Sequence, residues 1–270
     1  MTGVEGCDPR AHDRYRTPTG WLELTVTQGL LEPHLPVEGT VLDLGSGTDA
    51  YAQWLSARGL RTVRAETDDH ERDFARGLPS AADEVVDADV RDLARWADDT
   101  FDVTTVLGPF HRMAGAADRD RALAEAVRVT RPGGLLAISF VPRYTYLRHL
   151  LLFGSSGSLI LGDHEATRAI LTDGRVLDPS TGAPTGGFAA DPAAVAPSVE
   201  SHGVDTVLLG STHGFATEME TQVDSIRRVD RDLGAYDAAV ALLVQTATDP
   251  SILGLAGHLL YVGRVRGRSG

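Results

Sequence analysis

The chain has 270 residues, of which 42% are hydrophobic, so it is long enough to bury one large core. Its formal net charge is −13, and all 25 basic residues are arginine. An acidic chain without a basic run argues against sequence-independent binding to nucleic acid or to an anionic membrane. The single cysteine, Cys7, excludes an intrachain disulfide and fits the reducing cytoplasm, where we expect the protein. The polar N-terminus and the absence of an apolar run of about 18 residues predict neither a signal peptide nor a membrane span.

Residues 1–38 are expected to form an N-terminal helical cap. Apolar residues recur at helical spacing between Asp13 and Leu35, which predicts one or two helices. We expect an interruption near 18–20, where proline and glycine stand close together, and an end at Pro33 or Pro36.

Residues 39–141 alternate short apolar runs with helical segments. The expected strands are 41–44, 61–66, 84–88, 101–107 and 135–140, and the expected helices are 50–58, 69–76, 90–96 and 118–130. Such alternation predicts a doubly wound, parallel α/β sheet, with its ligand-facing loops at the carboxyl ends of the strands.

Residues 142–191 break this rhythm and are expected to form a lid over the site. A helix at 144–153 is followed by a glycine- and serine-rich joint and by an irregular, glycine- and proline-rich stretch. A long insertion after a strand end often covers a binding site, although a surface loop bearing a helix is the simpler alternative.

Residues 192–270 are expected to complete the core. We predict a helix from 191 to 202, a strand at 204–209, mostly helical structure at 216–246 with a break near Gly234, a turn or short helix at 250–255, and a last strand at 258–265. The two late strands fit an antiparallel edge pair, which gives a seven-stranded, mostly parallel sheet.

Residues 40–51 contain the most informative turn. An apolar run leads to Asp43, then to two glycines, Gly45 and Gly47, and then to a helix-like segment. Glycines here permit backbone angles that a Cβ forbids and let the main chain approach a ligand, while the helix start favours an anionic group. The turn alone is compatible with phosphate, a nicotinamide dinucleotide or another nucleoside cofactor.

The order and spacing of several further segments resemble class I S-adenosylmethionine-dependent methyltransferases, which have a Rossmann-like fold. The resembling segments are Val41–Gly47 (first motif), Glu66 (acid after the second strand), Asp87–Val90 (third motif), 101–109 (fourth motif) and 131–135 (the turn into the fifth strand). A bacterial subgroup usually reads Leu-Gly-Pro-Leu-Tyr-His-Leu in the fourth motif, where this chain reads Leu-Gly-Pro-Phe-His-Arg-Met at 107–113. Segments 141–144, 249–254 and 258–264 also resemble that subgroup.

The resemblance implies S-adenosylmethionine as cofactor, with S-adenosylhomocysteine as product. It places Glu66 on the ribose hydroxyls and the acid of the third motif on the adenine amino group. The residues expected to hold the cofactor are Asp43, Gly45, Ser46, Gly47, Asp49, Glu66, Asp89, Val90, Leu107 and Gly108. The same glycine turn with Glu66 also fits a nicotinamide fingerprint, which stays open as the alternative.

Two departures from the family pattern stand out. Asp49 occupies the position of the usual third glycine, where its carboxylate could bind the ammonium of the cofactor or turn to solvent as a helix cap. His111 and Arg112 replace the usual Tyr-His pair, which suggests a different substrate or chemistry.

Acceptor-side candidates follow from residue chemistry. His111 and His213 come after expected strand ends and could act as the general base, since histidine takes a proton near pH 7. Tyr15 and Tyr144 could close over the site, and Arg112 and Arg143 could hold an anionic group of the substrate. No convincing metal-ligand pattern is found, so no metal is expected.

We expect a methyltransferase acting on an O, N or C atom of a small molecule, in specialised metabolism. The alternatives are an enzyme that transfers or cyclises the aminocarboxypropyl arm of S-adenosylmethionine, releasing methylthioadenosine, and a protein that binds the cofactor without catalysis. The sequence does not determine the oligomeric state and leaves a homodimer open.

Overall fold

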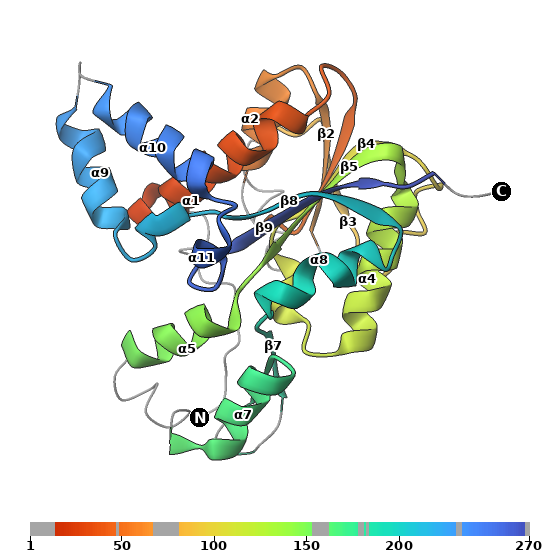
Figure 1. Ribbon diagram of the computed structural model, residues 1–270. Helices are drawn as coiled ribbons and strands as arrows, with labels where there is room; N and C mark the ends of the chain where they lie inside the picture. Colours follow the sequence, from red (N-terminus) through yellow and green to blue (C-terminus); the bar gives the residue numbers. More distant parts are fainter. Residues whose placement is uncertain are drawn as a thin grey trace.

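The computed structural model describes residues 14–46, 49–66, 81–152, 162–177, 181, 184–230 and 234–267. A seven-stranded sheet with strand order β3-β2-β1-β4-β5-β9-β8 forms its centre (Figure 1). The strands are β1 (Thr40–Leu44), β2 (Arg61–Glu66), β3 (Glu84–Asp87), β4 (Phe101–Val106), β5 (Thr130–Phe140), β8 (Val204–Ser211) and β9 (Leu259–Val265). β1 to β5 pair in parallel, and β9 runs antiparallel to both β5 and β8. The predicted doubly wound sheet is confirmed.

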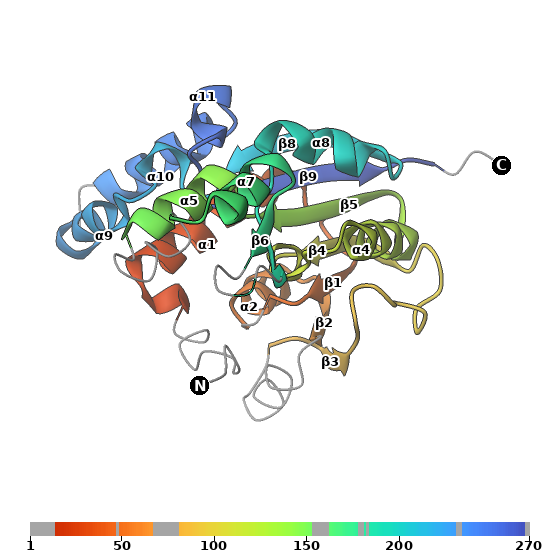
Figure 2. The ribbon, with the colours of Figure 1, turned by 90° about the horizontal axis from the view of Figure 1, so that it is seen from below.

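Helices cover both faces of the sheet (Figures 1 and 2). One face carries α1 (Pro18–Leu31), α2 (Ala50–Ala57), α9 (Glu220–Val229) and α10 (Ala235–Thr246), and the other carries α4 (Ala116–Val129) and α8 (Pro192–Glu200). Side chains alternate along β1, so Val41 enters the core beneath α1 and α2, whereas Leu42 and Leu44 enter the core beneath α4 and α8. Burial of both faces explains the almost continuous apolar runs of the parallel strands.

Short helical turns and one short helix join these elements. They are η2 (Arg14–Arg16), η3 (Glu32–His34), η4 (Pro109–Arg112), η5 (Gly214–Ala216) and α11 (Pro250–Leu253). Among the described residues, no helix has both the length and the apolar character needed to cross a bilayer.

Two helix predictions are corrected. The expected interruption near 18–20 is wrong, because Pro18 starts α1 and the hydroxyl oxygen of Thr17 accepts from Gly20 N–H at 3.1 Å as its cap. The expected helix at 90–96 is also wrong, because Asp89 and Asp92 accept backbone N–H groups two residues ahead and favour turns. The expected helix at 69–76 and the joint at 154–158 lie outside the described residues.

The two ends of the segment between β5 and α8 lie in contact with each other. It contains α5 (Arg143–Leu152), α7 (His164–Thr172) and a separate hairpin of β6 (Arg175–Leu177) and β7 (Pro184–Phe188). Pro142 bridges to Ala190, Arg143 N–H donates to Ala190 O at 2.9 Å, and the Arg143 guanidinium pairs with Asp191. The insertion therefore leaves and rejoins the core through a closed neck, and α5 and α7 lie beyond the end of β5, below the sheet in Figure 1.

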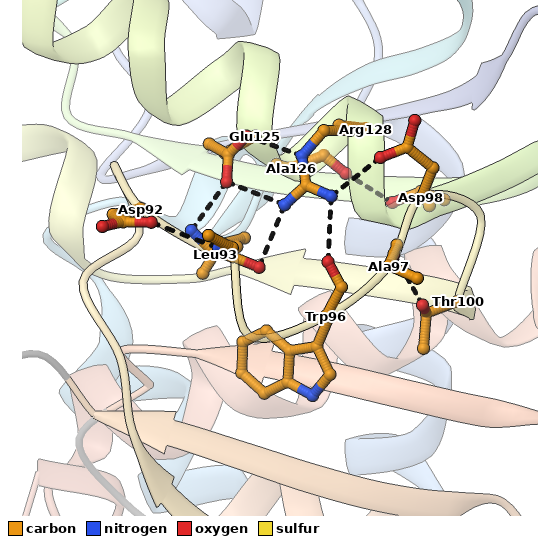
Figure 3. A network of polar contacts seen from close by, with 11 residues as sticks. Asp92, Leu93, Trp96, Ala97, Asp98, Thr100, Glu125, Ala126 and Arg128 are labelled. Carbon is orange, nitrogen blue, oxygen red and sulfur yellow. Dashed lines mark hydrogen bonds and ion pairs between the residues drawn. The ribbon is translucent and has the colours of Figure 1, made fainter.

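One guanidinium holds the turns before β4 against α4 (Figure 3). Arg128 donates to both carboxylate oxygens of Glu125, at 2.7 and 2.9 Å, and to the carbonyls of Leu93 and Trp96, both at 2.9 Å. Glu125 in turn accepts from Leu93 N–H at 2.6 Å. These bonds satisfy the N–H and carbonyl of Leu93 and the carbonyl of Trp96 within the turns.

We predict that Arg128→Met lowers the free energy of unfolding by about 2–3 kcal/mol at pH 7, because several charge-assisted bonds are lost together. Arg121→Met, on an exposed position of the same helix, should change it by less than about 0.5 kcal/mol. Urea denaturation measures both, and equal losses would contradict the role of the network.

The effect of Arg128→Met should also depend on pH. Arg128 is the main cause of the lowered pKa of Glu125. A carboxyl group with a lowered pKa stabilises the fold fully above its unfolded pKa, and this contribution is lost as the pH falls through the folded pKa. The difference between wild type and variant should therefore shrink in acid.

Candidate functional site

The carboxyl ends of β1, β2 and β4 meet at one edge of the sheet. The parallel register pairs Leu44 with Ala65 on one side and with Val106 on the other. Gly45, Glu66 and Leu107 consequently stand next to one another at this edge.

Two backbone loops approach closely here. A Cβ on Gly108 would overlap the carbonyl oxygen of Gly45, and a Cβ on Gly45 would lie 3.0 Å from Cδ of Pro109. Gly45 also has φ of +64°, a conformation that side chains strain. Both positions require glycine because the two loops pack directly against each other. We call this pair of closely packed main-chain loops the cradle. Gly47 lies outside the described residues.

Asp43 fixes the glycine turn from beneath. Its buried carboxylate accepts from the hydroxyls of Ser46 at 2.6 Å and Thr105 at 2.8 Å. Burial raises the pKa of Asp43, while these two hydrogen bonds and the nearby Arg64 oppose the rise. The Ser46 side chain is thus directed to the protein interior, so we assign both residues to shaping the turn.

Asp49 and Glu66 share one partner, Arg64. The Nε of Arg64 donates to Oε1 of Glu66 at 2.8 Å, and its Nη1 lies 3.9 Å from Oδ1 of Asp49. Asp49 also accepts from Ala81 N–H at 2.8 Å and from the amide of Gln53 at 3.2 Å. Asp49 therefore joins the start of α2 to the segment before β3, and neither of the two roles expected for it is needed to explain it.

The third-motif residues separate into a core residue and a surface residue. Val90 is buried in the core beneath α4, whereas the Asp89 carboxylate is partly exposed and held by Arg91, whose Nη2 lies 2.5 Å away. Arg91 is the main cause of the lowered pKa of Asp89. An adenine amino group at Asp89 would have to share this carboxylate with Arg91.

A polar cluster lies where α1 meets the same edge. His213 follows β8 and is buried, with its ring stacked on His258 at a centroid distance of 6.2 Å. Nδ1 of His258, just before β9, lies 3.6 Å from Oε1 of the buried Glu23 on α1. Glu23 in turn contributes, after burial and Tyr15, to raising the pKa of Tyr51 on α2.

The fourth-motif departure lies on the turn after β4. Phe110 of η4 is buried against Phe140, at a ring distance of 5.3 Å, which leaves His111 half-buried and Arg112 exposed. β7 of the insertion packs alongside η4. His111 and Arg112 therefore lie between the sheet edge and the insertion.

The remaining predicted substrate residues differ in how far neighbouring groups already engage their side chains. Tyr15 packs edge-on against Tyr51 at 5.8 Å, and Tyr144 on α5 is about half exposed. Arg143 is engaged by Asp191 and by the carbonyl of Leu171, so its side chain closes the neck of the insertion. Across the described residues, His, Cys, Asp and Glu side chains form no group of three that could hold a metal ion.

Comparison with known proteins agrees with this geometry. Residues 42–138 match the methyltransferase domain family. Residues 42–138 are a methyltransferase domain, as the resemblance of the motifs implied. The cofactor of this domain is S-adenosylmethionine, and the nicotinamide alternative is set aside.

Relatives of known sequence or structure are distant. Methyltransferase GfsG of Streptomyces halstedii is 34% identical over 104 residues, which cover 37% of this chain and 36% of that protein. The match thus spans about a third of the length of that relative. An S-adenosylmethionine-dependent methyltransferase of Methanosarcina mazei has a TM-score of 0.55 at 14% identity, covering 87% of this chain and 96% of its own. The [4+2]-cyclase SpnF has a TM-score of 0.50 at 17% identity, covering 92% and 82%.

The described residues fit this cofactor. Gly45 and Gly108 carry no side chain that could cover the main chain of these loops, and the carboxylate of Glu66 lies at the next strand end. A carboxylate accepts from two neighbouring hydroxyls, as a ribose presents them.

Sequence reasoning missed three residues of the edge: Glu23, Arg64 and His258. Glu23 stands one helical turn before Thr27 on the otherwise apolar buried face of α1, and this polar pair was a readable signal. Arg64 stands two residues before Glu66 and so shares its strand face, which the alternation of a strand also predicts. Nothing local indicates that His258 meets Glu23.

We predict that Gly108→Ala weakens binding of S-adenosylhomocysteine by about 5- to 150-fold, because the added methyl forces the two loops apart at a cost of about 1–3 kcal/mol. Gly254→Ala, where an added Cβ meets nothing within 4 Å, should bind like wild type. Calorimetric titration measures both. Wild-type affinity in Gly108→Ala would show that this loop pair is not the cofactor cradle.

Proposed function

We propose that this protein transfers the methyl group of S-adenosylmethionine to an O, N or C atom of a small molecule in specialised metabolism. The observation that carries the proposal is the main-chain cradle at Gly45 and Gly108, with Glu66 at the neighbouring strand end. The methyltransferase domain match over residues 42–138 supports it.

In the proposed mechanism the protein mainly positions the cofactor and the acceptor and shields them from water. Bound S-adenosylmethionine supplies a methyl group already activated by its sulfonium. Gly45, Gly108 and Glu66 hold the cofactor, while Leu107 lines the same loop. Orientation and exclusion of water then supply most of the acceleration.

The acceptor side would be formed by the insertion and by α1. Residues 142–191 act as a lid that closes over the edge through the neck at Arg143 and Asp191. Tyr15, Tyr144, His111 and Arg112 are the side chains we assign to the acceptor, and a covered site favours a small molecule over a macromolecule. Arg143 we now assign to the neck.

The structure weakens one argument for a non-methylating reaction. An aspartate at the position of the usual third glycine is one of the two departures that favour such a reaction. The contacts of Asp49 with Arg64, Gln53 and Ala81 give this residue a structural role instead. The His111–Arg112 departure remains, and so does the likeness to the fold of a cyclase. Methyl transfer is therefore the leading proposal and aminocarboxypropyl transfer or cyclisation the second.

Product analysis separates these reactions. The protein is incubated with S-adenosylmethionine and a panel of phenols, carboxylic acids, amines and activated carbon acids. We expect S-adenosylhomocysteine in equal amount to a methylated acceptor, as measured by mass spectrometry. Methylthioadenosine would instead indicate attack on the aminocarboxypropyl arm. Cofactor binding without either product would favour a binding protein.

We further propose His258, with Glu23 beside it, as a proton acceptor in addition to His111 and His213. His258 keeps 24% of its side chain exposed at the edge, whereas His213 is buried behind it. A carboxylate next to an imidazole orients the ring and stabilises its protonated form.

If the acceptor loses a proton, His258→Asn should lower kcat by about 10²-fold or more with little change in cofactor affinity. Glu23→Gln should move the acid limb of the pH–rate profile to lower pH, because the imidazolium loses its stabilising charge. His202→Asn is the matched control, since Nε2 of His202 also lies near a carboxylate, 3.9 Å from Oδ1 of Asp120. An unchanged profile in Glu23→Gln would exclude this pair and leave His111.

A further inference from the structure

The end of β2 carries a buried ion pair that the family pattern does not require. Arg64 and Glu66 lie on the same strand face, and their side chains are 3% and 0% exposed. The Nε of Arg64 donates to Oε1 of Glu66 at 2.8 Å. A carboxylate proposed to bind ribose is thus already held by an arginine of its own strand.

Burial makes this partner necessary. A carboxylate removed from water shifts towards its neutral form unless a positive charge or hydrogen bonds stabilise it. A protonated Glu66 would present a donor to the ribose, whereas an ionised one offers only acceptors. An ionised carboxylate offers an acceptor oxygen to each of the two ribose hydroxyls, so it is the form best suited to bind both at once.

The surroundings of Arg64 also favour an ionised Glu66. Among the described residues, Nη2 of Arg64 is buried and makes no hydrogen bond, so the strong contact of this guanidinium is the one from Nε to Glu66. Arg64 is fixed through Asp49, which accepts from Ala81 N–H, and it stands beside Asp43 in the sheet register. The guanidinium is therefore held by Glu66 on its own strand and lies within ion-pair distance of Asp49 at the start of α2.

We propose that Arg64 is a positioning residue of the cofactor site, which keeps Glu66 ionised and orients its carboxylate towards the ribose hydroxyls of S-adenosylmethionine. The proposal rests on the placement of the ribose at Glu66. It assigns to Arg64 a share of cofactor recognition without direct contact with the cofactor.

A binding cycle tests it without any methyl acceptor. The affinities of S-adenosylhomocysteine and of its 2′,3′-dideoxy analogue, which lacks both ribose hydroxyls, are measured by calorimetry. Wild type should prefer S-adenosylhomocysteine by roughly 30-fold or more, as expected for hydrogen bonds to a charged group. Arg64→Met, which keeps length but removes charge, should reduce this preference to within about threefold.

Matched variants separate positioning from general damage. Arg61→Met removes an exposed arginine of the same strand, whose Nη2 lies 3.6 Å from Glu84, and should retain the wild-type preference. Arg64→Lys keeps the charge and should recover a preference of about tenfold. If Arg64→Met does not fold, Arg64→Gln replaces it as the uncharged variant. The comparison of Arg64→Gln with Arg64→Lys then keeps the test decisive.

Two results would overturn the proposal and are distinguishable. If the uncharged variants lose affinity for both ligands equally and keep the preference, Arg64 is only structural. If wild type itself shows no preference, and Glu66→Gln changes nothing, the ribose does not bind at Glu66 and the cofactor placement fails with it. A preference lost in Arg64→Met and recovered in Arg64→Lys supports the proposal.

Discussion

The close approach of two main-chain loops, at Gly45 and Gly108, is the constraint on which the rest of the site depends. No side chain fits between them, so the distance between the ends of β1 and β4 must be set by the sheet itself. The parallel pairing of Leu44 with Val106 sets it, and the bond from Thr105 to Asp43 ties the two strands directly below the loops. A cradle made of backbone is rigid because it inherits the geometry of the sheet.

Buried charge is the second feature of this edge, and acidic groups outnumber basic groups in it. Three carboxylates, Asp43, Asp49 and Glu66, surround the single guanidinium of Arg64. Replacing such a group by apolar residues would often stabilise a protein, so its presence argues for a function rather than for stability. The arrangement also shows why Asp49 could take the place of a glycine here. Its carboxylate faces a guanidinium of the neighbouring strand, with Nη1 of Arg64 3.9 Å from Oδ1.

Local patterns in the sequence predicted most of the fold, because the strands and the glycine turn follow from short-range periodicity and spacing. The role of Glu66 was implied by the family resemblance and stays a prediction. At 90–96, where the prediction of a helix failed, one deciding partner lies far along the chain. The turns at 90–96 depend on Arg128, which is 35 residues beyond Leu93. The Thr17-Pro18 start of α1 was a local signal and could have been read.

The acceptor side was harder to predict because it is assembled from distant elements. Glu23 lies on α1, the first long helix, and His258 lies next to β9, the last strand, which is inserted between β5 and β8. The two residues meet because α1 passes beside the start of β9. The neck at Arg143 and Asp191 likewise joins residues at the two ends of a long insertion. In the proposed site, the cofactor half is built by the ends of adjacent strands, whereas the acceptor half is built by additions to the sheet. Changes in α1 or in the insertion can therefore alter the acceptor without disturbing the pairing of β1 with β4, and this separation allows one sheet to serve different substrates.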